Sequence, residues 1–402
     1  MAAPLADESG EIGGTRQPPK MEVSVMSRIS KLTLFAALGA SLTLLSGAGA
    51  QAQNVPGTVS VTVPYPSFAG SYWTPEKMRA AIPLDAGLRG SPRPNPNAAP
   101  GGPTGSPGAA GGRPPGRGAM FPSLSGAALR AVMPTAASGS PVGAGAAYPG
   151  PQTTYYYGPK YVTYPVSTIG KLFFTINGAG YVCSASVTTG SASINNIIWT
   201  AGHCVANGGA STFYSNWVFC PSYNSGGVNP TRGCWNATGA TTTTAWFANG
   251  DWTRDYAYIT LANLGSVLNE DVALATGSLG FGYNFGRDEV WTHLGYPQAS
   301  PYNGSYIVQT NTQYAYTDTG QTGASASPNS WGSRQTPGSS GSALLLGFSY
   351  ASPGDPYGQA PWINSTVSYY YTAESNFELQ GPYYDTFACS VWQQGTGWTG
   401  TC

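Results

Sequence analysis

Charged side chains are scarce in this sequence of 402 residues, since Asp, Glu, Lys and Arg make up only 8% of it, against about 25% in a typical soluble domain. Basic and acidic residues each number 17, so the formal net charge is zero. The missing basic excess disfavours a nucleic-acid-binding protein, which needs a positive field to hold phosphates. The scarcity of charge also excludes a coiled coil, whose helices expose charged faces.

Histidine is even scarcer, with two residues in the chain, so any chemistry that needs an imidazole has two candidate positions. Strong helix formers are sparse, whereas the sequence contains 55 glycines and 26 tyrosines. This composition disfavours a large helical fold.

The N-terminal residues 1–52 have the pattern of a targeting signal. Arg28 and Lys31 precede an apolar run over residues 32–45, and small residues then lead to Ala50-Gln51-Ala52. A basic region, a short apolar run and an A-x-A site are typical of a secretory signal peptide. At about 14 residues the run is too short to span a bilayer.

Residues 1–25 do not fit a signal peptide, so we expect translation to start at Met26 or, as the alternative, at Met21. Residues 53–154 are predicted to be a pro-segment or linker, with a short strand at 59–63 and a short helix near 76–81. Within it, residues 91–150 hold 12 prolines and 13 glycines. Such a composition is typical of disordered, low-complexity sequence.

From residue 155 to residue 402, short runs of β-branched and aromatic residues alternate with Gly, Asn and Ser turns, as in 171–175, 197–200 and 343–348. Strands of about five residues at this spacing predict an all-β sandwich or barrel.

All six cysteines lie in this β-rich part. An even number of cysteines in an exported protein predicts three disulfides, and six cysteines can pair in 15 ways. Pairing in sequence order closes three short loops and gives Cys183–Cys204, Cys220–Cys234 and Cys389–Cys402. The chain has no C-x-x-C or comparable ligand spacing, so we expect no metal site.

His203 is the first candidate for a catalytic role. It lies in Thr200-Ala201-Gly202-His203-Cys204, directly after an apolar strand. A disulfide from Cys204 to the upstream Cys183 would hold this imidazole in place, as a general base requires. We interpret His293, in Trp291-Thr292-His293, as structural.

Ser340 is the candidate nucleophile, in Gly338-Ser339-Ser340-Gly341-Ser342. A serine hydroxyl needs a base to take its proton, and the flanking glycines let the backbone turn sharply. The N–H groups of Gly338 and Ser340 could then bind a developing oxyanion.

A carboxylate between these two positions would orient the imidazole. Asp255 begins the alternating strand Asp255-Tyr256-Ala257-Tyr258-Ile259 and is the favoured candidate. Asp251 is the alternative, although Gly250 and Trp252 give it a more turn-like setting.

Together, these three motifs resemble those of the trypsin/chymotrypsin-like serine proteases, most closely the bacterial V8-like (glutamyl endopeptidase-like) branch. The resemblance covers about residues 160–402. It implies two packed six-stranded antiparallel barrels, about 155–265 and 270–402, with the site between them. It also implies His203 as general base, Asp255 as its orienter and Ser340 as nucleophile, without a cofactor.

The specificity pocket departs from this pattern. The resemblance places residues 362–366 along the pocket, so Asn364 and Ser365 are candidate pocket residues, but the histidine expected there is absent. Arg334, six residues before Ser340, is a further candidate, which could bind an acidic substrate side chain by bidentate hydrogen bonds.

The sequence therefore predicts a secreted serine endopeptidase made as a zymogen, with activation cleavage between about 130 and 160. Its expected partners are a polypeptide substrate and its own pro-segment. We expect a monomer with no nucleic acid and, in the mature form, no membrane. The alternative is a protease-like binding module with an inactive site. An α/β-hydrolase esterase does not fit, because its histidine would follow the serine.

Overall fold

The computed structural model describes residues 55–64, 72–90, 94–95, 105–116, 124–125, 152–155, 161–191, 196–263, 270–287, 289–348, 361–373 and 378–402. The predicted signal peptide and both candidate start sites lie outside these residues, as does most of the stretch 130–160. No helix within the described ranges is long and apolar enough to cross a membrane.

Six strands of the first predicted barrel close into an antiparallel ring. The ring closes because β14 (Trp235–Thr243) pairs with both β13 (Ser215–Pro221) and β15 (Ala257–Leu261). Its interior is filled by buried apolar side chains such as Leu172, Ile198 and Trp235. In order, the strands are β14 (Trp235–Thr243), β13 (Ser215–Pro221), β8 (Ile169–Ile176), β9 (Ala179–Val187), β10 (Ile197–Thr200) and β15 (Ala257–Leu261).

A second ring is formed by antiparallel strands further along the chain. After β21 (Trp362–Thr366) the chain continues to Tyr369, which pairs with Gln380 of β23 (Glu378–Gly381). This pairing joins the first and last strands of the sheet into a ring. In order, the strands are β23 (Glu378–Gly381), β19 (Asn329–Gly332), β18 (Val308–Asp318), β17 (Val290–Gly295), β20 (Ala343–Leu346) and β21 (Trp362–Thr366). The predicted all-β fold with two six-stranded barrels is therefore confirmed.

The second sheet also carries strands that the barrel prediction lacks. β16 (Gly280–Tyr283) pairs with β21 in the parallel direction, and β5 (Gly108–Ala110) pairs with β16. β5 comes from the stretch rich in proline and glycine. Its Ala109 and Ala110 are buried, because these small residues let the strand approach the sheet closely. Shorter strands at this sheet are β4 (Pro94–Asn95), β6 (Leu124–Ser125) and β7 (Gln152–Tyr155).

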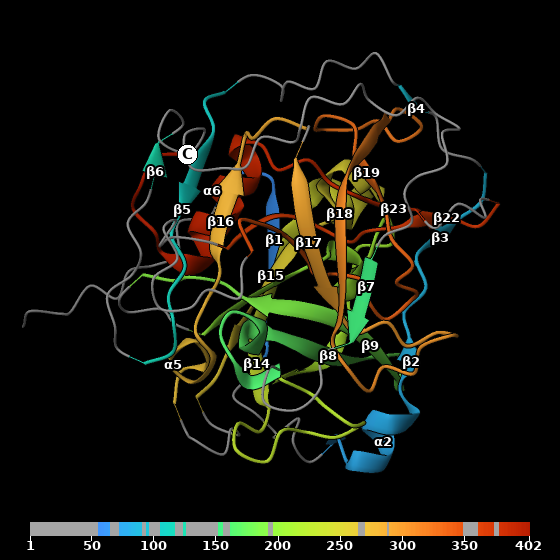
Figure 1. The fold of residues 1–402 in the computed structure, drawn as a ribbon, viewed down its shortest axis with the longest axis vertical. Coiled ribbons are helices and arrows are strands. Elements are labelled where there is room, and N and C mark those ends of the chain that lie inside the picture. The colour runs from blue at the N-terminus through green and yellow to red at the C-terminus, as the bar shows by residue number, and fades with distance from the viewer. Residues whose placement is uncertain are drawn as a thin grey trace, which may run out of the picture. The chain divides into compact units, whose positions relative to one another are not determined.

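Other described parts of the N-terminal segment also pair with the barrels. The predicted strand is present as β1 (Thr58–Thr62), antiparallel to β14, and the predicted helix as α2 (Pro75–Ala80). After α2, β2 (Ile82–Pro83) lies parallel to β9, and β3 (Gly87–Leu88) lies parallel to β22 (Tyr370–Tyr371). Figure 1 shows this stretch in blue, running from α2 past β2 to β3.

Aromatic side chains fill the space between the barrels. Trp199 of the first barrel packs against Phe281 and Tyr384. The last helix, α6 (Thr386–Thr396), lies beside β16, and its Trp392 stacks on Phe281. The remaining elements are η2 (Val166–Thr168), η3 (Gly202–Cys204), β11 (Ala206–Asn207), β12 (Thr212–Phe213), α4 (Thr244–Asn249), η4 (Trp252–Arg254) and α5 (Val272–Thr276).

The structure contains three disulfides, and their pairing follows sequence order. Cys183–Cys204 joins β9 to η3, Cys220–Cys234 joins β13 to the residue before β14, and Cys389–Cys402 ties α6 to the C-terminal residue.

Candidate active site

His203 lies in the short turn η3 that follows β10, and its side chain is almost completely buried. The Cys183–Cys204 disulfide anchors this turn to β9. Gly202 leaves room for the acid of the site, because a Cβ there would lie 2.9 Å from Asp255 Oδ1. The imidazole of His203 is thus held on one side by the disulfide of Cys204 and on the other by the close approach of Gly202 to Asp255.

Asp255, just before β15, is fully buried and binds His203 at two atoms. Its Oδ1 accepts the backbone N–H of His203 at 2.6 Å, and its Oδ2 lies 2.7 Å from Nδ1 of the imidazole. A carboxylate at Nδ1 favours the tautomer whose proton is on Nδ1, which leaves Nε2 as an acceptor. Nε2 is buried and has no hydrogen-bond partner among the described residues.

Asp251, the alternative carboxylate, has a structural role. Its Oδ1 accepts the Thr253 N–H at 2.9 Å and the Thr253 hydroxyl at 2.7 Å, capping η4. Its Oδ2 accepts the N–H of Ala324 at 2.7 Å. Both oxygens are therefore used to hold neighbouring loops.

Ser340 lies in the loop between β19 and β20, and Ser184 of β9 holds this loop. The Ser184 N–H donates to the Ser340 carbonyl at 2.8 Å, and the Ser184 hydroxyl donates to the Gly338 carbonyl at 2.9 Å. Because Ser184 follows Cys183, the same part of β9 fixes both the Ser340 loop and, through the disulfide, the turn of His203.

Close packing at Gly341 brings the Ser340 loop against the residues that precede His203. Gly341 has a φ of +78°, and a Cβ there would lie 2.1 Å from Thr200 Oγ1 and 2.9 Å from the Ala201 nitrogen. The structure thus brings the three predicted chemical groups to one region. Only the His203–Asp255 pair is joined directly; no hydrogen bond between Ser340 and His203 is present among the described contacts.

The backbone around Ser340 leaves two donors available. No hydrogen bond in the described part of the chain uses the N–H of Gly338 or of Ser340. Gly338 has a φ of +104°, a conformation that other residues rarely adopt, and a Cβ there would lie 2.8 Å from the Tyr296 carbonyl oxygen. Such unoccupied backbone donors beside a nucleophile are suited to binding an oxyanion.

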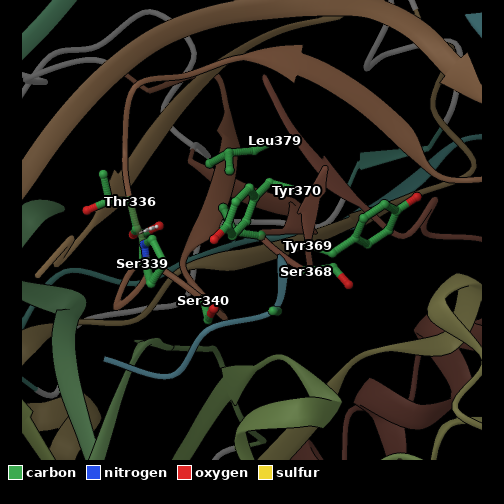
Figure 2. Close-up of a pocket in the computed structure, with 10 residues that line it drawn as sticks. Thr336, Ser339, Ser340, Ser368, Tyr369, Tyr370 and Leu379 are labelled. Atoms are coloured by element: carbon green, nitrogen blue, oxygen red, sulfur yellow. Dashed lines mark hydrogen bonds between the residues drawn. The ribbon is translucent and has the colours of Figure 1, made fainter. Parts of the chain in front are cut away.

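Ser340 borders a pocket of about 220 Å³, its open mouth included. Figure 2 shows the ring of Tyr370 between Ser340 and Leu379, while Tyr369 points away from them. Burial, with a contribution from a hydrogen bond to Asp85, raises the pKa of Tyr370 to about 12. The labelled residues around the pocket are Thr336, Ser339, Ser340, Ser368, Tyr369, Tyr370 and Leu379.

None of the three pocket residues expected from the sequence lines this pocket in the structure. Arg334 is exposed. Asn364 is buried and accepts the Trp291 indole N–H at 3.0 Å. The hydroxyl of Ser365 donates to the Pro382 carbonyl at 2.8 Å.

Among the residues that do line it, Val367 to Tyr370 directly follow the predicted segment 362–366, and sequence reasoning missed them. Ser368 is functionally the most informative, because its hydroxyl donates to Asp255. Its position shortly after the expected segment was the one signal that could have found it.

His293, the second histidine, is fully buried. Its Nε2 lies 2.6 Å from the Ser342 hydroxyl, and its Nδ1 lies 3.4 Å from the Ser333 hydroxyl. Burial lowers the pKa of His293 to about 3, so the ring is neutral near pH 7.

One cluster of described residues has the spacing of metal ligands, with the ligand atoms of Cys183, His203 and Cys204 within 4.8 Å of one another. Both sulfur atoms are joined in the disulfide, so they offer no thiolate to a metal. The cluster is explained by the disulfide beside the imidazole.

No protein-family model matches this chain, and no curated protein matches it. Its structure is similar to that of the thermostable serine protease AL20 from an extremophilic microorganism, with 28% identity and a TM-score of 0.49. That alignment covers 58% of this chain and 98% of the other. The protease Anisep from Arthrobacter nicotinovorans is 29% identical with a TM-score of 0.49, over 58% of this chain and 97% of the other.

A Glu endopeptidase is 16% identical with a TM-score of 0.45, over 61% of this chain and 97% of the other.

Proposed function

We propose that this chain is a serine endopeptidase in which Ser340 is the nucleophile, His203 the general base and Asp255 the group that orients the base. The observation that carries the proposal is the His203–Asp255 pair, with Nδ1 held at 2.7 Å from a buried carboxylate oxygen. The opposite nitrogen, Nε2, has no partner among the described residues and is therefore available to accept a proton. The packing of Gly341 on Ala201 supports Ser340 as the donor of that proton.

In the proposed reaction, Ser340 Oγ attacks the carbonyl carbon of the peptide bond while His203 Nε2 takes the hydroxyl proton. The carbonyl oxygen becomes negative and is bound by the N–H groups of Gly338 and Ser340, a contribution of about 3–4 kcal/mol for one such donor. When the C–N bond breaks, Nε2 gives its proton to the leaving amine. Water then attacks the acyl-enzyme in the same way and releases the acid product.

We further propose that the enzyme is exported and made as a zymogen. Three disulfides favour an oxidising compartment. The pairing of β3 with β22 supports a blocking role of the N-terminal segment, since β22 begins at a residue that lines the pocket beside Ser340. The proposed partners of the mature, monomeric enzyme are polypeptide substrates.

The test is the variant Ser340→Ala in the secreted protein, assayed for peptide hydrolysis and for labelling by a fluorophosphonate probe. We expect a loss of activity by about four to six orders of magnitude and no labelling. Ser390→Ala is the control, because among the described residues the Ser390 hydroxyl bonds only its own helix, to Thr386 O at 3.0 Å. Wild-type protein that has lost its N-terminal segment and still neither hydrolyses peptides nor reacts at Ser340 would instead be a binding module.

A further inference from the structure

The pocket beside Ser340 is narrow and uncharged. None of the described residues that line it is Asp, Glu, Lys, Arg or His. Tyr370 and Leu379 reduce its width, since the Tyr370 ring lies between Ser340 and Leu379 (Figure 2). An ionised side chain in this pocket would lose water without gaining a partner of opposite charge, which is strongly unfavourable.

The chain itself supplies one wall of this pocket through Ala86. Ala86 lies in a segment that is anchored on both sides. Before it, the N–H of Leu84 donates to Val182 O at 3.0 Å, and after it, Leu88 O accepts the N–H of Thr372 at 3.0 Å. In Figure 2 this segment is the blue ribbon that passes beside Ser340 and Ser368.

Two contacts set the position of Ala86 relative to Tyr370. Asp85 accepts the Tyr370 hydroxyl at 2.9 Å, and Gly87 pairs with Tyr370 in the register of β3 and β22. A Cβ at Gly87 would lie 2.8 Å from Thr372 Cγ2 and 2.9 Å from the Tyr370 hydroxyl. Because the residues on both sides of Ala86 are held against Tyr370, its methyl group is the side chain that the segment offers to the pocket.

We propose that Tyr370 and Leu379 are specificity-determining residues that restrict this pocket to small, uncharged side chains, and that Ala86, which borders the pocket, blocks the entry of a substrate residue. This inference rests on the proposed function, because it names the substrate class of the same site. The preferred substrates are peptides with a residue such as alanine or serine in this pocket. Acidic side chains, which Arg334 could have bound, are disfavoured, since Arg334 does not line the pocket.

The first experiment measures how fast a fluorophosphonate labels Ser340 in the full-length chain when residue 86 is changed. Ala86→Ser and Ala86→Gly should label at the wild-type rate, because both side chains are small and uncharged. Ala86→Phe and Ala86→Arg should label at least 10-fold faster, since these side chains do not fit and the segment leaves. Arg89→Gln, an exposed position beyond β3, is the control. A wild-type rate in Ala86→Phe and Ala86→Arg would overturn the placement of Ala86.

The second experiment compares kcat/KM for peptides that differ only in the residue before the cut bond. The full-length Ala86→Arg chain is the enzyme, and its active sites are counted by labelling. Alanine should exceed phenylalanine, glutamate and lysine by at least 10-fold. Adding Leu379→Gly or Tyr370→Gly should reduce the ratio of alanine to phenylalanine at least 10-fold, whereas Arg334→Gln should leave the profile unchanged.

The inference would be overturned if the enzyme preferred glutamate and Arg334→Gln removed that preference. It would also be overturned if neither Leu379→Gly nor Tyr370→Gly changed the ratio of alanine to phenylalanine. In each of these cases Ser340 is still labelled and peptides are still cut, so the proposed function stands. Absence of labelling in every variant would contradict the proposed function itself.

Discussion

The Ser368 hydroxyl donates a hydrogen bond of 2.5 Å to Asp255 Oδ2, the same oxygen that contacts Nδ1 of His203. Asp255 comes from the first barrel and Ser368 from the segment that joins β21 to β22 in the second. The bond therefore links Asp255 of the first barrel to a segment of the second barrel, and this segment lines the pocket. Ser368 is a positioning residue, since it acts through Asp255.

Replacement of this hydroxyl tests the link. Ser368→Ala should reduce kcat about 10-fold, equivalent to about 1.4 kcal/mol in the barrier, with a much smaller change in KM. The reason is that Asp255 loses one of the donors that hold it, so the imidazole is less well oriented. The measurement is steady-state kinetics on a peptide substrate, together with the rate of fluorophosphonate labelling at Ser340.

Ser365→Ala is the matched control, because Ser365 is also fully buried and its hydroxyl bonds Pro382 O rather than Asp255. It should cost about 1 kcal/mol of stability and leave kcat unchanged. Equal kcat in Ser368→Ala and Ser365→Ala would show that the bond to Asp255 does not position the base.

Gly341 offers a test of the packing that holds the nucleophile loop. Gly341→Ala should abolish labelling of Ser340 and destabilise the protein, because the new Cβ would lie 2.1 Å from Thr200 Oγ1 and 2.6 Å from Ser184 O. Both neighbours belong to the barrel that carries His203, so the loop can relieve the clash only by moving Ser340 away. The measurements are urea denaturation and labelling at Ser340.

Gly178→Ala separates this clash from backbone strain. Gly178 has a similar φ of +82°, but a Cβ there has no atom within 4 Å. Strain at a positive φ costs about 1 kcal/mol, so Gly178→Ala should lose that much stability and keep full labelling. If both variants lost labelling equally, close packing at Gly341 would not explain its role.

The sequence motifs predicted the parts of the site that are local in the chain. Gly202-His203-Cys204 is informative because a cysteine beside a histidine, with its partner Cys183 on β9, limits where the imidazole can lie. Alternation of polar and apolar residues, with regular turns, was sufficient to predict an all-β fold. The strand β5 could not be predicted in this way, because its small residues show no alternation and the prolines and glycines of residues 91–150 dominate the composition of the stretch.

The pocket could not be predicted in the same way. All five residues of β21 are buried, so the strand has no alternation that would show which side chains face the substrate. The pairing of β20 with β21 also has a register shift between Leu344 and Leu345. Such a shift changes which residues of the strand face a given side of the sheet. Ala86 contributes from a segment that precedes Ser340 by about 250 residues, and no local pattern connects the two positions.

His293 gives a prediction about stability and pH. Burial lowers the pKa of His293 to about 3 in the folded chain, whereas it is about 6.5 in an unfolded chain. Between these values the unfolded chain binds a proton that the folded chain does not, so stability falls as the pH drops from 6.5 towards 3. At pH 5 the expected loss from this group is about 2 kcal/mol, at about 1.4 kcal/mol per pKa unit.

The variant His293→Gln keeps a polar side chain at this position but cannot be protonated. Between pH 7 and pH 5 its free energy of unfolding, measured in urea, should fall by about 2 kcal/mol less than that of the wild type. Lys171→Met is the control, since burial lowers the pKa of Lys171 to about 7. Lys171 therefore changes the pH dependence of stability between pH 7 and about 10.5, where stability rises with pH, and not in the acid range. Parallel acid curves for wild type and His293→Gln would mean that another group dominates the acid sensitivity.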